Sequence, residues 1–430
     1  MKINRKIISL AFALALLIVF MLSATSCSTE AIFGSPTEQG SPTQPTPKPP
    51  YSDGVNDTQS GAGDSSSDEP IFHPEANNPA DIEELSPEAK TLLSAVAIHA
   101  IFDIPDYYYG DPMKYTSYGS GVIYELDRDS GDALIITNYH VVFNADEINE
   151  NGFSDEISLF LYGMEDEQYA VNAVVVGGSM TYDLALLRVE NSEVIKNSMA
   201  IPATFGDSEG VRVFDEVLAV GNPEGRRISV TEGIVSVYSE PLKMVGADGR
   251  TSITVRVMRI SAAINDGNSG GGLYDTDGRL IAVVNAKRTG EEIDNIAYAL
   301  PVYLVERVVK NILYNCDGET NLSVKKVAIG VEIDPLSSGL VADGDRLTIV
   351  EQVGISKIYD TCITDRLAVG DIINSITIDG KTTKVTRNYH VTENLLLVKA
   401  GSTLVLNLTR GEETFDLTLV IPAAAISAIK

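Results

Sequence analysis

Between about residue 90 and residue 300 the chain repeats short runs rich in Val, Ile and Tyr, separated by Gly, Asn and Asp. Examples are "ALIITNY", "YAVNAVVVG" and "GRLIAVVNA". Many short apolar segments with turn residues between them are typical of an all-β barrel or sandwich. Because the runs are nearly continuous, the strands are expected to be buried on one face and partly covered on the other. The pattern predicts a mostly β fold.

A helix and a second unit are expected after these strands. The stretch "PVYLVERVVKNILYN" at 301–315 begins with proline and places apolar residues at helical spacing, which predicts a helix. From about residue 323 the chain shows strand-like runs, an Asp-Gly turn and a terminal hairpin. Between them, "VTENLLLVKAG" predicts a short helix that ends at Gly401. This second unit is expected to be a small, mostly β module.

The N-terminus has the layout of a secretory signal. Basic residues precede the apolar run "IISLAFALALLIVFML", and small residues follow in "SATSCS". The small residues before Cys27 resemble a bacterial lipobox, which implies cleavage before Cys27 and its lipidation. We interpret 1–26 as a lipoprotein signal peptide, and an uncleaved membrane anchor is the alternative. Both interpretations place the remaining chain outside the cytoplasm, at a bacterial cell membrane and facing the exterior or periplasm.

Composition separates a linker from the globular part and excludes some partners. Residues 27–84 are rich in Ser, Pro, Thr and Gly and poor in apolar residues, which predicts a disordered linker. The chain has 60 acidic and 32 basic residues and a net charge of −28, which argues against a nucleic-acid partner. Cys316 and Cys362 could form one disulfide or remain two buried thiols, and their spacing matches no zinc site.

The stretch "NDGNSGGGLYD" at 265–275 raises the question of whether Ser269 is a loop residue or a nucleophile. A serine hydroxyl needs a base, and the chain has four histidines. Of these, His140 ends an apolar strand, and Asp183 opens another in "MTYDLALLRV". If Asp183 accepts from His140, it fixes the imidazole tautomer and stabilises the imidazolium. The alternatives are a solvated strand-end histidine and a strand-capping aspartate.

The glycines around the serine suggest how a developing oxyanion would be held. Gly267 and the turn through Asn268 can direct the N–H groups of Gly267 and Ser269 toward one point. The following glycines, Gly270 and Gly271, allow close approach of substrate and backbone. We therefore predict an oxyanion hole made by residues 267–269.

Taken together, these stretches resemble the HtrA/Deg family of trypsin-like serine proteases. The matching segments run in family order over roughly 85–315: "GSGVI" (119–123), "ITNYHVV" (136–142), "DLALLRV" (183–189), "AVGNPEG" (219–225), "SVTEGIVS" (229–236), "AAINDGNSGGGL" (262–273) and "NIAYALPV" (295–302). The resemblance implies a chymotrypsin-like double six-stranded β-barrel at 85–318 and a small PDZ-like β/α domain at 322–425. It assigns the base, orienting and nucleophile roles to His140, Asp183 and Ser269, without metal or organic cofactor.

The resemblance also implies a specificity pocket and a peptide-binding groove. The residues implied for the pocket are Ile264, Asn285, Ala286 and Lys287. Lys287 stands where the family usually has an apolar residue, so the lining would be partly cationic unless the lysine turns outward. The family usually has aspartate and proline where this chain has Ser261 and Asp266. The residues that match the carboxylate-binding loop of PDZ domains are Ala328, Ile329, Gly330 and Val331.

The resulting hypothesis is an envelope-anchored serine endopeptidase that cleaves unfolded or exposed protein segments. The resemblance implies that the PDZ domain binds peptide C-termini and that the chain can form a homotrimer. The alternative is a catalytically silent peptide-binding scaffold that works through the PDZ groove. The complete set of His140, Asp183 and Ser269 favours the enzyme.

Overall fold

The computed structural model describes residues 82–429, apart from 107–109, 226, 286–295 and 345. The chain divides into two compact units, Met1–Pro70 and Ile71–Lys430, and every described residue belongs to the second. The predicted signal peptide, Cys27 and nearly all of the predicted linker therefore lie outside the described residues.

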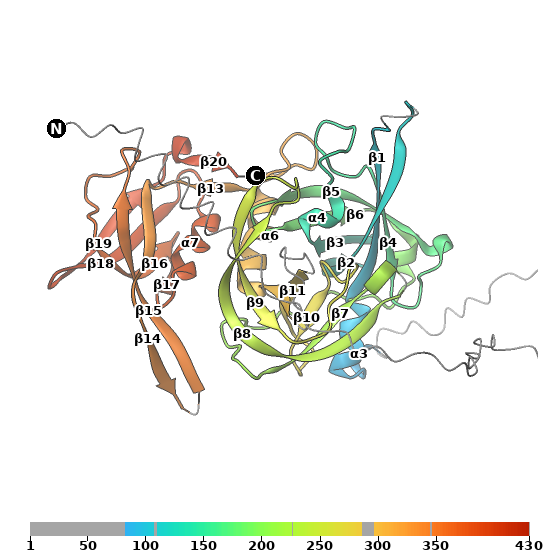
Figure 1. Ribbon diagram of the computed structural model, residues 1–430, viewed down its shortest axis with the longest axis horizontal. Coiled ribbons are helices and arrows are strands. Elements are labelled where there is room, and N and C mark those ends of the chain that lie inside the picture. Colours follow the sequence, from blue (N-terminus) through green and yellow to red (C-terminus); the bar gives the residue numbers. More distant parts are fainter. Residues whose placement is uncertain (1–81, 107–109, 226, 286–295, 345, 430) are drawn as a thin grey trace, which may run out of the picture. The chain divides into compact units, whose positions relative to one another are not determined.

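The first barrel is closed by six strands in the order β1-β2-β3-β6-β5-β4 (Figure 1). Its strands are β1 (Ala95–Ile104), β2 (Met113–Asp127), β3 (Asp132–Thr137), β4 (Glu156–Leu161), β5 (Val171–Ser179) and β6 (Leu184–Val189). Ile98, Ile135 and Leu187 are at most 1% exposed and form part of its core. Burying a side chain of this size contributes about 1.5–3 kcal/mol, so this barrel has a substantial core of its own.

The second barrel repeats the closed arrangement in the order β10-β11-β12-β9-β8-β7. Its strands are β7 (Glu216–Gly221), β8 (Ser229–Val245), β9 (Ser252–Ile260), β10 (Gly272–Tyr274), β11 (Leu280–Asn285) and β12 (Ala297–Pro301). Leu273, Val235 and Met258 are fully buried in it. The prediction of a mostly β fold with a double six-stranded barrel is confirmed.

Short helices accompany the barrels. They are α3 (Pro87–Leu93), α4 (Tyr139–Val142), η2 (Glu167–Tyr169), α5 (Glu193–Lys196) and η3 (Pro223–Gly225). The predicted helix after the strands is α6 (Val302–Asn315), which begins directly after Pro301. Its buried face packs into one cluster with first-barrel residues such as Leu186, second-barrel residues such as Val257, and Leu396 of the C-terminal module. Helix α6 therefore packs against all three parts of the described chain.

The C-terminal module is a sheet in the order β14-β15-β16-β18-β19, with β17 paired to β16 and a separate β13-β20 pair. Its elements are β13 (Lys325–Val327), β14 (Val331–Asp343), β15 (Arg346–Ile358), β16 (Ile372–Ile378), β17 (Lys381–Lys384), α7 (Tyr389–Thr392), η4 (Asn394–Leu397), β18 (Thr403–Arg410), β19 (Glu413–Val420), η5 (Ala423–Ala425) and β20 (Ile426–Ala428). The prediction of a small, mostly β module is confirmed, while its assignment as a PDZ domain stays a prediction.

The helix predicted at 391–401 is shorter than expected. The chain forms one α-turn, α7, and then the 3₁₀ turn η4 before it turns at Gly401, whose φ is +85°. The carbonyl of Leu396 accepts a hydrogen bond from Asn311 of α6 at 2.6 Å. Since this carbonyl has a partner outside the segment, the segment can end in a 3₁₀ turn without leaving it unsatisfied.

A buried polar cluster joins the module to the second barrel. Arg256 of β9 donates from Nε and Nη2 to the two carboxylate oxygens of Glu393, each at 2.7 Å. His390 and Tyr389 of α7 both hydrogen-bond Oε2 of Glu209, at 2.8 and 2.9 Å. Paired and bidentate contacts of this kind are what makes buried charge tolerable. The module is thus held by specific polar contacts as well as by apolar packing.

The two cysteines within the described residues are not bridged. Cys316 follows α6, and burial raises the pKa of its thiol to about 11. Such a thiol is a poor nucleophile at neutral pH. The structure therefore favours two separate thiols over the disulfide that the sequence left open.

Candidate active site

The candidate site lies where the two barrels contribute neighbouring loops. His140 lies on α4, directly after β3, and Asp183 lies directly before β6, so both come from the first barrel. Ser269 lies in the turn between β9 and β10 of the second barrel. His140 and Ser269 are 129 positions apart in the sequence. They come into contact because one follows a strand of the first barrel and the other precedes a strand of the second.

The three side chains form one chain of hydrogen bonds. Nε2 of His140 lies 2.9 Å from Oγ of Ser269, and Nδ1 lies 2.7 Å from Oδ2 of Asp183. The backbone N–H of His140 also donates to Oδ1 of Asp183 at 3.1 Å. A carboxylate beside Nδ1 favours the tautomer that carries its proton on Nδ1. Nε2 is then unprotonated and can accept the serine proton. The arrangement is chemically suited to activating a hydroxyl nucleophile.

Asp183 is held more firmly than a strand cap would require. It is 1% exposed, and its φ of +51° is a left-handed backbone conformation that is uncommon outside glycine. Besides His140, the Nδ2 group of Asn285 donates to its Oδ2 at 2.9 Å, and Asn138 donates to its main-chain carbonyl at 2.9 Å. The contacts from His140 and Asn285 satisfy the buried carboxylate, which is otherwise costly to bury, and the contact from Asn138 holds the backbone.

Ser120 of β2 in the first barrel holds the serine turn, which belongs to the second barrel. The Ser120 N–H donates to the carbonyl of Ser269 at 2.8 Å, and its hydroxyl donates to the carbonyl of Gly267 at 2.7 Å. The same hydroxyl accepts from the N–H of Asn222 at 2.7 Å. Sequence reasoning used "GSGVI" only as a matching motif and did not assign this role to Ser120. A polar residue between two glycines in an apolar strand was the available signal.

The glycines after Ser269 allow close approach of neighbouring backbone, and their close approach to substrate stays a prediction. A Cβ at Gly270, where φ is +86°, would lie 2.2 Å from the carbonyl oxygen of Ser120. A Cβ at Gly271 would lie 2.3 Å from the carbonyl oxygen of Val220. The close approach that these glycines permit is therefore to the protein's own strands β2 and β7.

The other predicted residues of the serine turn are also located. Gly267 has a φ of +96°, and Asn268 and Ser269 are only 6% and 5% exposed. Among the described residues, the N–H of Gly267 donates to no protein acceptor, which leaves it available to a ligand oxygen.

Ser261 stands where the family usually has another residue. Its hydroxyl accepts a hydrogen bond from the N–H of Ile234 at 3.0 Å, so the serine is accommodated within the barrel.

The predicted pocket residues are only partly within the described chain. Ile264 is half-buried against the core of the second barrel, and Asn285 contacts Asp183 as described above. Ala286 and Lys287 lie outside the described residues, so their part in substrate selection stays a prediction. No group of three or more potential metal ligands is found among the residues that the structure describes.

The two other histidines within the described residues, His99 and His390, pack into structural surroundings. His99 of β1 packs between the rings of Tyr118 and Phe160, with centroid distances of 4.8 and 4.7 Å. Burial lowers the pKa of His99. His390 belongs to the cluster that joins the module to the second barrel.

Comparison with known proteins shows which proteases the chain is similar to. Residues 119–283 match the trypsin-like peptidase domain family. The serine protease Do-like HtrA of Lactococcus lactis subsp. cremoris is 27% identical over 327 residues, which cover 71% of this chain and 74% of the relative. The serine protease Do-like HtrA of Bacillus subtilis is 36% identical over 197 residues, or 45% of this chain and 39% of that protein. These matches support an HtrA-family serine protease. The chain is a serine endopeptidase.

Among solved structures, the HtrA-type protease AlgW with a decapeptide is similar to this chain. The match has 22% sequence identity and a TM-score of 0.49, and it covers 78% of this chain and 97% of the AlgW chain. The decapeptide belongs to that structure.

Asn285 gives a test of how Asp183 is oriented in this serine endopeptidase. Replacing Asn285 by Ala removes the amide donor to Asp183, and we expect kcat to fall about tenfold with little change in KM, since a hydrogen bond to a charged group is worth about 1.5–3 kcal/mol. Steady-state cleavage of a fluorogenic peptide measures this. A kcat within twofold of the wild type would show that the amide only fills space.

Proposed function

We propose that Ser269 is the nucleophile of this endopeptidase, His140 its general base and Asp183 the residue that orients the base. The observation that supports this assignment is the continuous hydrogen-bond chain from Oγ of Ser269 through His140 to the buried Asp183. None of these contacts alone is specific, because strand-end histidines and capping aspartates are common. Their combination in one protease-family chain is what the reaction needs.

The reaction follows from these positions. Oγ of Ser269 attacks the scissile carbonyl carbon while its proton passes to Nε2 of His140. The N–H groups of Gly267 and Ser269 would stabilise the resulting oxyanion. The Nε2–H then protonates the leaving amine as the C–N bond breaks, which gives an acyl-enzyme and a free amino terminus. A water, deprotonated by His140, attacks the ester, and Ser269 recovers its proton as the acid product leaves.

The substrates are proposed to be unfolded or exposed polypeptide segments. Ser269 is only 5% exposed, so an extended chain can reach it more readily than a folded surface. The test is cleavage of casein and of a second protein in its native and denatured forms by the detergent-solubilised full chain, with Ser269→Ala as control. Equal cleavage of native and denatured substrate would contradict the preference.

A catalytically silent scaffold is the alternative from another class. Covalent labelling by a fluorophosphonate separates the two, since only an activated serine reacts. Label on Ser269 supports the enzyme, whereas an unlabelled Ser269 in a folded, peptide-binding protein supports the scaffold.

The module at 322–425 is proposed to be a PDZ domain that binds peptide C-termini through residues 328–331. Gly330 has a φ of +79°, and a Cβ there would lie 2.4 Å from Cys362, so only glycine fits this turn. Strand β14 follows at once and is an edge strand of the described sheet, paired there with β15, so its other edge could accept an added strand. We expect a labelled peptide with a free C-terminus to bind at least tenfold more tightly than its amidated form in fluorescence anisotropy. Equal affinities would argue against a carboxylate site.

Anchoring to the cell envelope is proposed from the N-terminal pattern. None of the described helices combines the length and apolar character needed to cross a membrane. If Cys27 is lipidated, the wild-type protein should partition into the detergent phase and Cys27→Ser should not, because firm anchoring needs acyl chains. A wild-type protein that stays in the aqueous phase with its linker intact would contradict this.

The homotrimer implied by the family resemblance also stays a prediction, and the mass of the solubilised protein tests it.

A further inference from the structure

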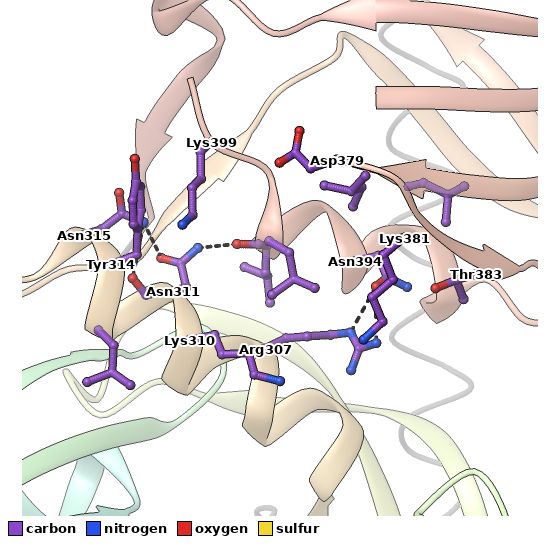
Figure 2. Close-up of a pocket in the computed structure, with 15 residues that line it drawn as sticks. Arg307, Lys310, Asn311, Tyr314, Asn315, Asp379, Lys381, Thr383, Asn394 and Lys399 are labelled. Atoms are coloured by element: carbon purple, nitrogen blue, oxygen red, sulfur yellow. Dashed lines mark hydrogen bonds between the residues drawn. The ribbon is translucent and has the colours of Figure 1, made fainter. Parts of the chain in front are cut away.

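A cavity of about 490 Å³ lies between helix α6 and the module (Figure 2), and none of His140, Asp183 and Ser269 lines it. One wall comes from α6, and the others come from β16, β17 and the segment around η4. Small-molecule sites typically occupy 300–1,000 Å³ and are often found where two parts of a protein meet. Both its size and its place therefore suit a small ligand.

Part of the cavity lining is apolar. The apolar side chains that line it are Leu313, Tyr314, Ile376, Ile378, Leu396 and Leu397. Of these, Leu313 and Tyr314 are 44% and 55% exposed, although large apolar side chains are usually covered. A ligand with an apolar body would remove this surface from water, which is worth about 25 cal/mol per Å².

Four cationic side chains surround the same cavity. They come from three separate segments of the chain: Arg307 and Lys310 from α6, Lys381 from β17, and Lys399 after η4. Among the described residues that line the cavity, Asp379 is the only acidic one, and its carboxylate already accepts from Ser402 and Thr403. In a chain with 60 acidic and 32 basic residues, such a concentration of positive charge runs against the composition.

These cations are poorly neutralised by the protein itself. Arg307 donates to the neutral oxygens of Asn394 and Tyr303, and burial lowers its pKa. The carboxylate nearest to Lys310 is that of Glu306, at 3.7 Å on an exposed helix face. Lys399 lies 3.5 Å from the ring centroid of Tyr314, and Lys381 pairs with no described carboxylate. The cavity therefore keeps an unsatisfied preference for negative charge.

We propose that this cavity binds a small amphipathic anion, a free carboxylate with an aliphatic body. The carboxylate would lie among Lys310, Lys381 and Arg307, and the aliphatic body would cover Leu313 and Leu397. A phosphate or nucleotide would leave the apolar wall uncovered, and a neutral hydrocarbon would leave the lysines without a partner. Because one ligand would contact both α6 and the module, its binding should also stabilise their contact.

Titration calorimetry of the full chain with decanoate, kept below its micelle concentration, tests the proposal. We expect saturable binding of one decanoate per chain, with no measurable binding of decanol or of decyltrimethylammonium. The double variant Lys310→Gln/Lys381→Gln should bind decanoate at least fivefold more weakly. Lys384→Gln is the matched control, because Lys384 lies on the same strand β17 but does not line the cavity, and it should bind as the wild type does.

Two further measurements locate the ligand and identify its source. A diazirine-bearing decanoate should label peptides that contain Leu313 or Leu397, and Leu313→Gln should reduce this label while the ligand-free melting temperature stays close to the wild type. Sedimentation with phosphatidylglycerol vesicles, using the Cys27→Ser chain, should show no dependence on Lys310 and Lys381. Equal binding of decanol, unchanged affinity of the double variant, label confined to β14, or lysine-dependent binding to vesicles alone would each overturn the proposal.

Discussion

Replacing Ser269 by Ala is expected to lower kcat for casein-type proteolysis by roughly 10⁶-fold, which in practice abolishes activity. The variant removes the Oγ that lies 2.9 Å from Nε2 of His140, so no acyl-enzyme can form. A small residual rate over water is expected, since oxyanion stabilisation and substrate binding survive. Initial rates on a fluorogenic peptide and on denatured casein, with the wild type measured in parallel, give the ratio.

The fold should tolerate this change, because the turn is held by backbone atoms. The contacts of Ser120 are to the carbonyls of Ser269 and Gly267, and neither uses the Ser269 hydroxyl. The melting temperature of the variant is therefore expected to stay within a few degrees of the wild type. Retention of full proteolytic activity by a folded Ser269→Ala protein would end the nucleophile assignment.

Replacing Asp183 by Asn is expected to lower kcat by roughly 10⁴-fold, with KM nearly unchanged. An amide can donate to Nδ1 of His140, which would place the imidazole proton on Nε2 and leave no base for Ser269. Oδ2 of Asp183 also accepts from Asn285, so an amide nitrogen there would face a second donor. Both effects act on the tautomer and orientation of His140 and leave the substrate contacts intact.

The measurement for Asp183→Asn is the pH dependence of kcat/KM. If the wrong tautomer is the cause, the residual rate should rise at alkaline pH, where hydroxide can replace the missing base. A variant that retains the wild-type rate and pH profile would reduce Asp183 to a strand cap. Asn138→Ala is a useful comparison, because Asn138 contacts only the main-chain carbonyl of Asp183 among the described contacts, and a much smaller loss is expected there.

Much of the barrel architecture was predictable because turn residues and apolar runs alternate along the chain with few interruptions. Helix α6 was predicted to within one residue, since Pro301 and the helical spacing mark it locally. The segment 391–401 was predicted less well, because its 3₁₀ turn depends on a hydrogen bond from Asn311, about 85 residues away. Local sequence cannot reveal a partner that only the folded chain supplies.

The same distinction applies to the site. Ser269 and His140 were candidates because glycines and a strand end mark them locally, and Asp183 followed from the roles that the two others need. Ser120 was missed, because its value lies in contacts with Gly267 and Asn222, more than 100 positions away. The cationic cavity was missed for the same reason, since Arg307, Lys381 and Lys399 are brought together by the docking of the module.

The hydrogen-bond chain is divided between two closed barrels, so activity depends on how the two barrels are packed together. His140 and Asp183 belong to one barrel and Ser269 to the other, so a small rigid-body shift between two intact barrels would separate base from nucleophile. On heating or in mild denaturant, proteolytic activity should then be lost before either barrel unfolds. A protease built in this way would lose its activity while both barrels are still folded.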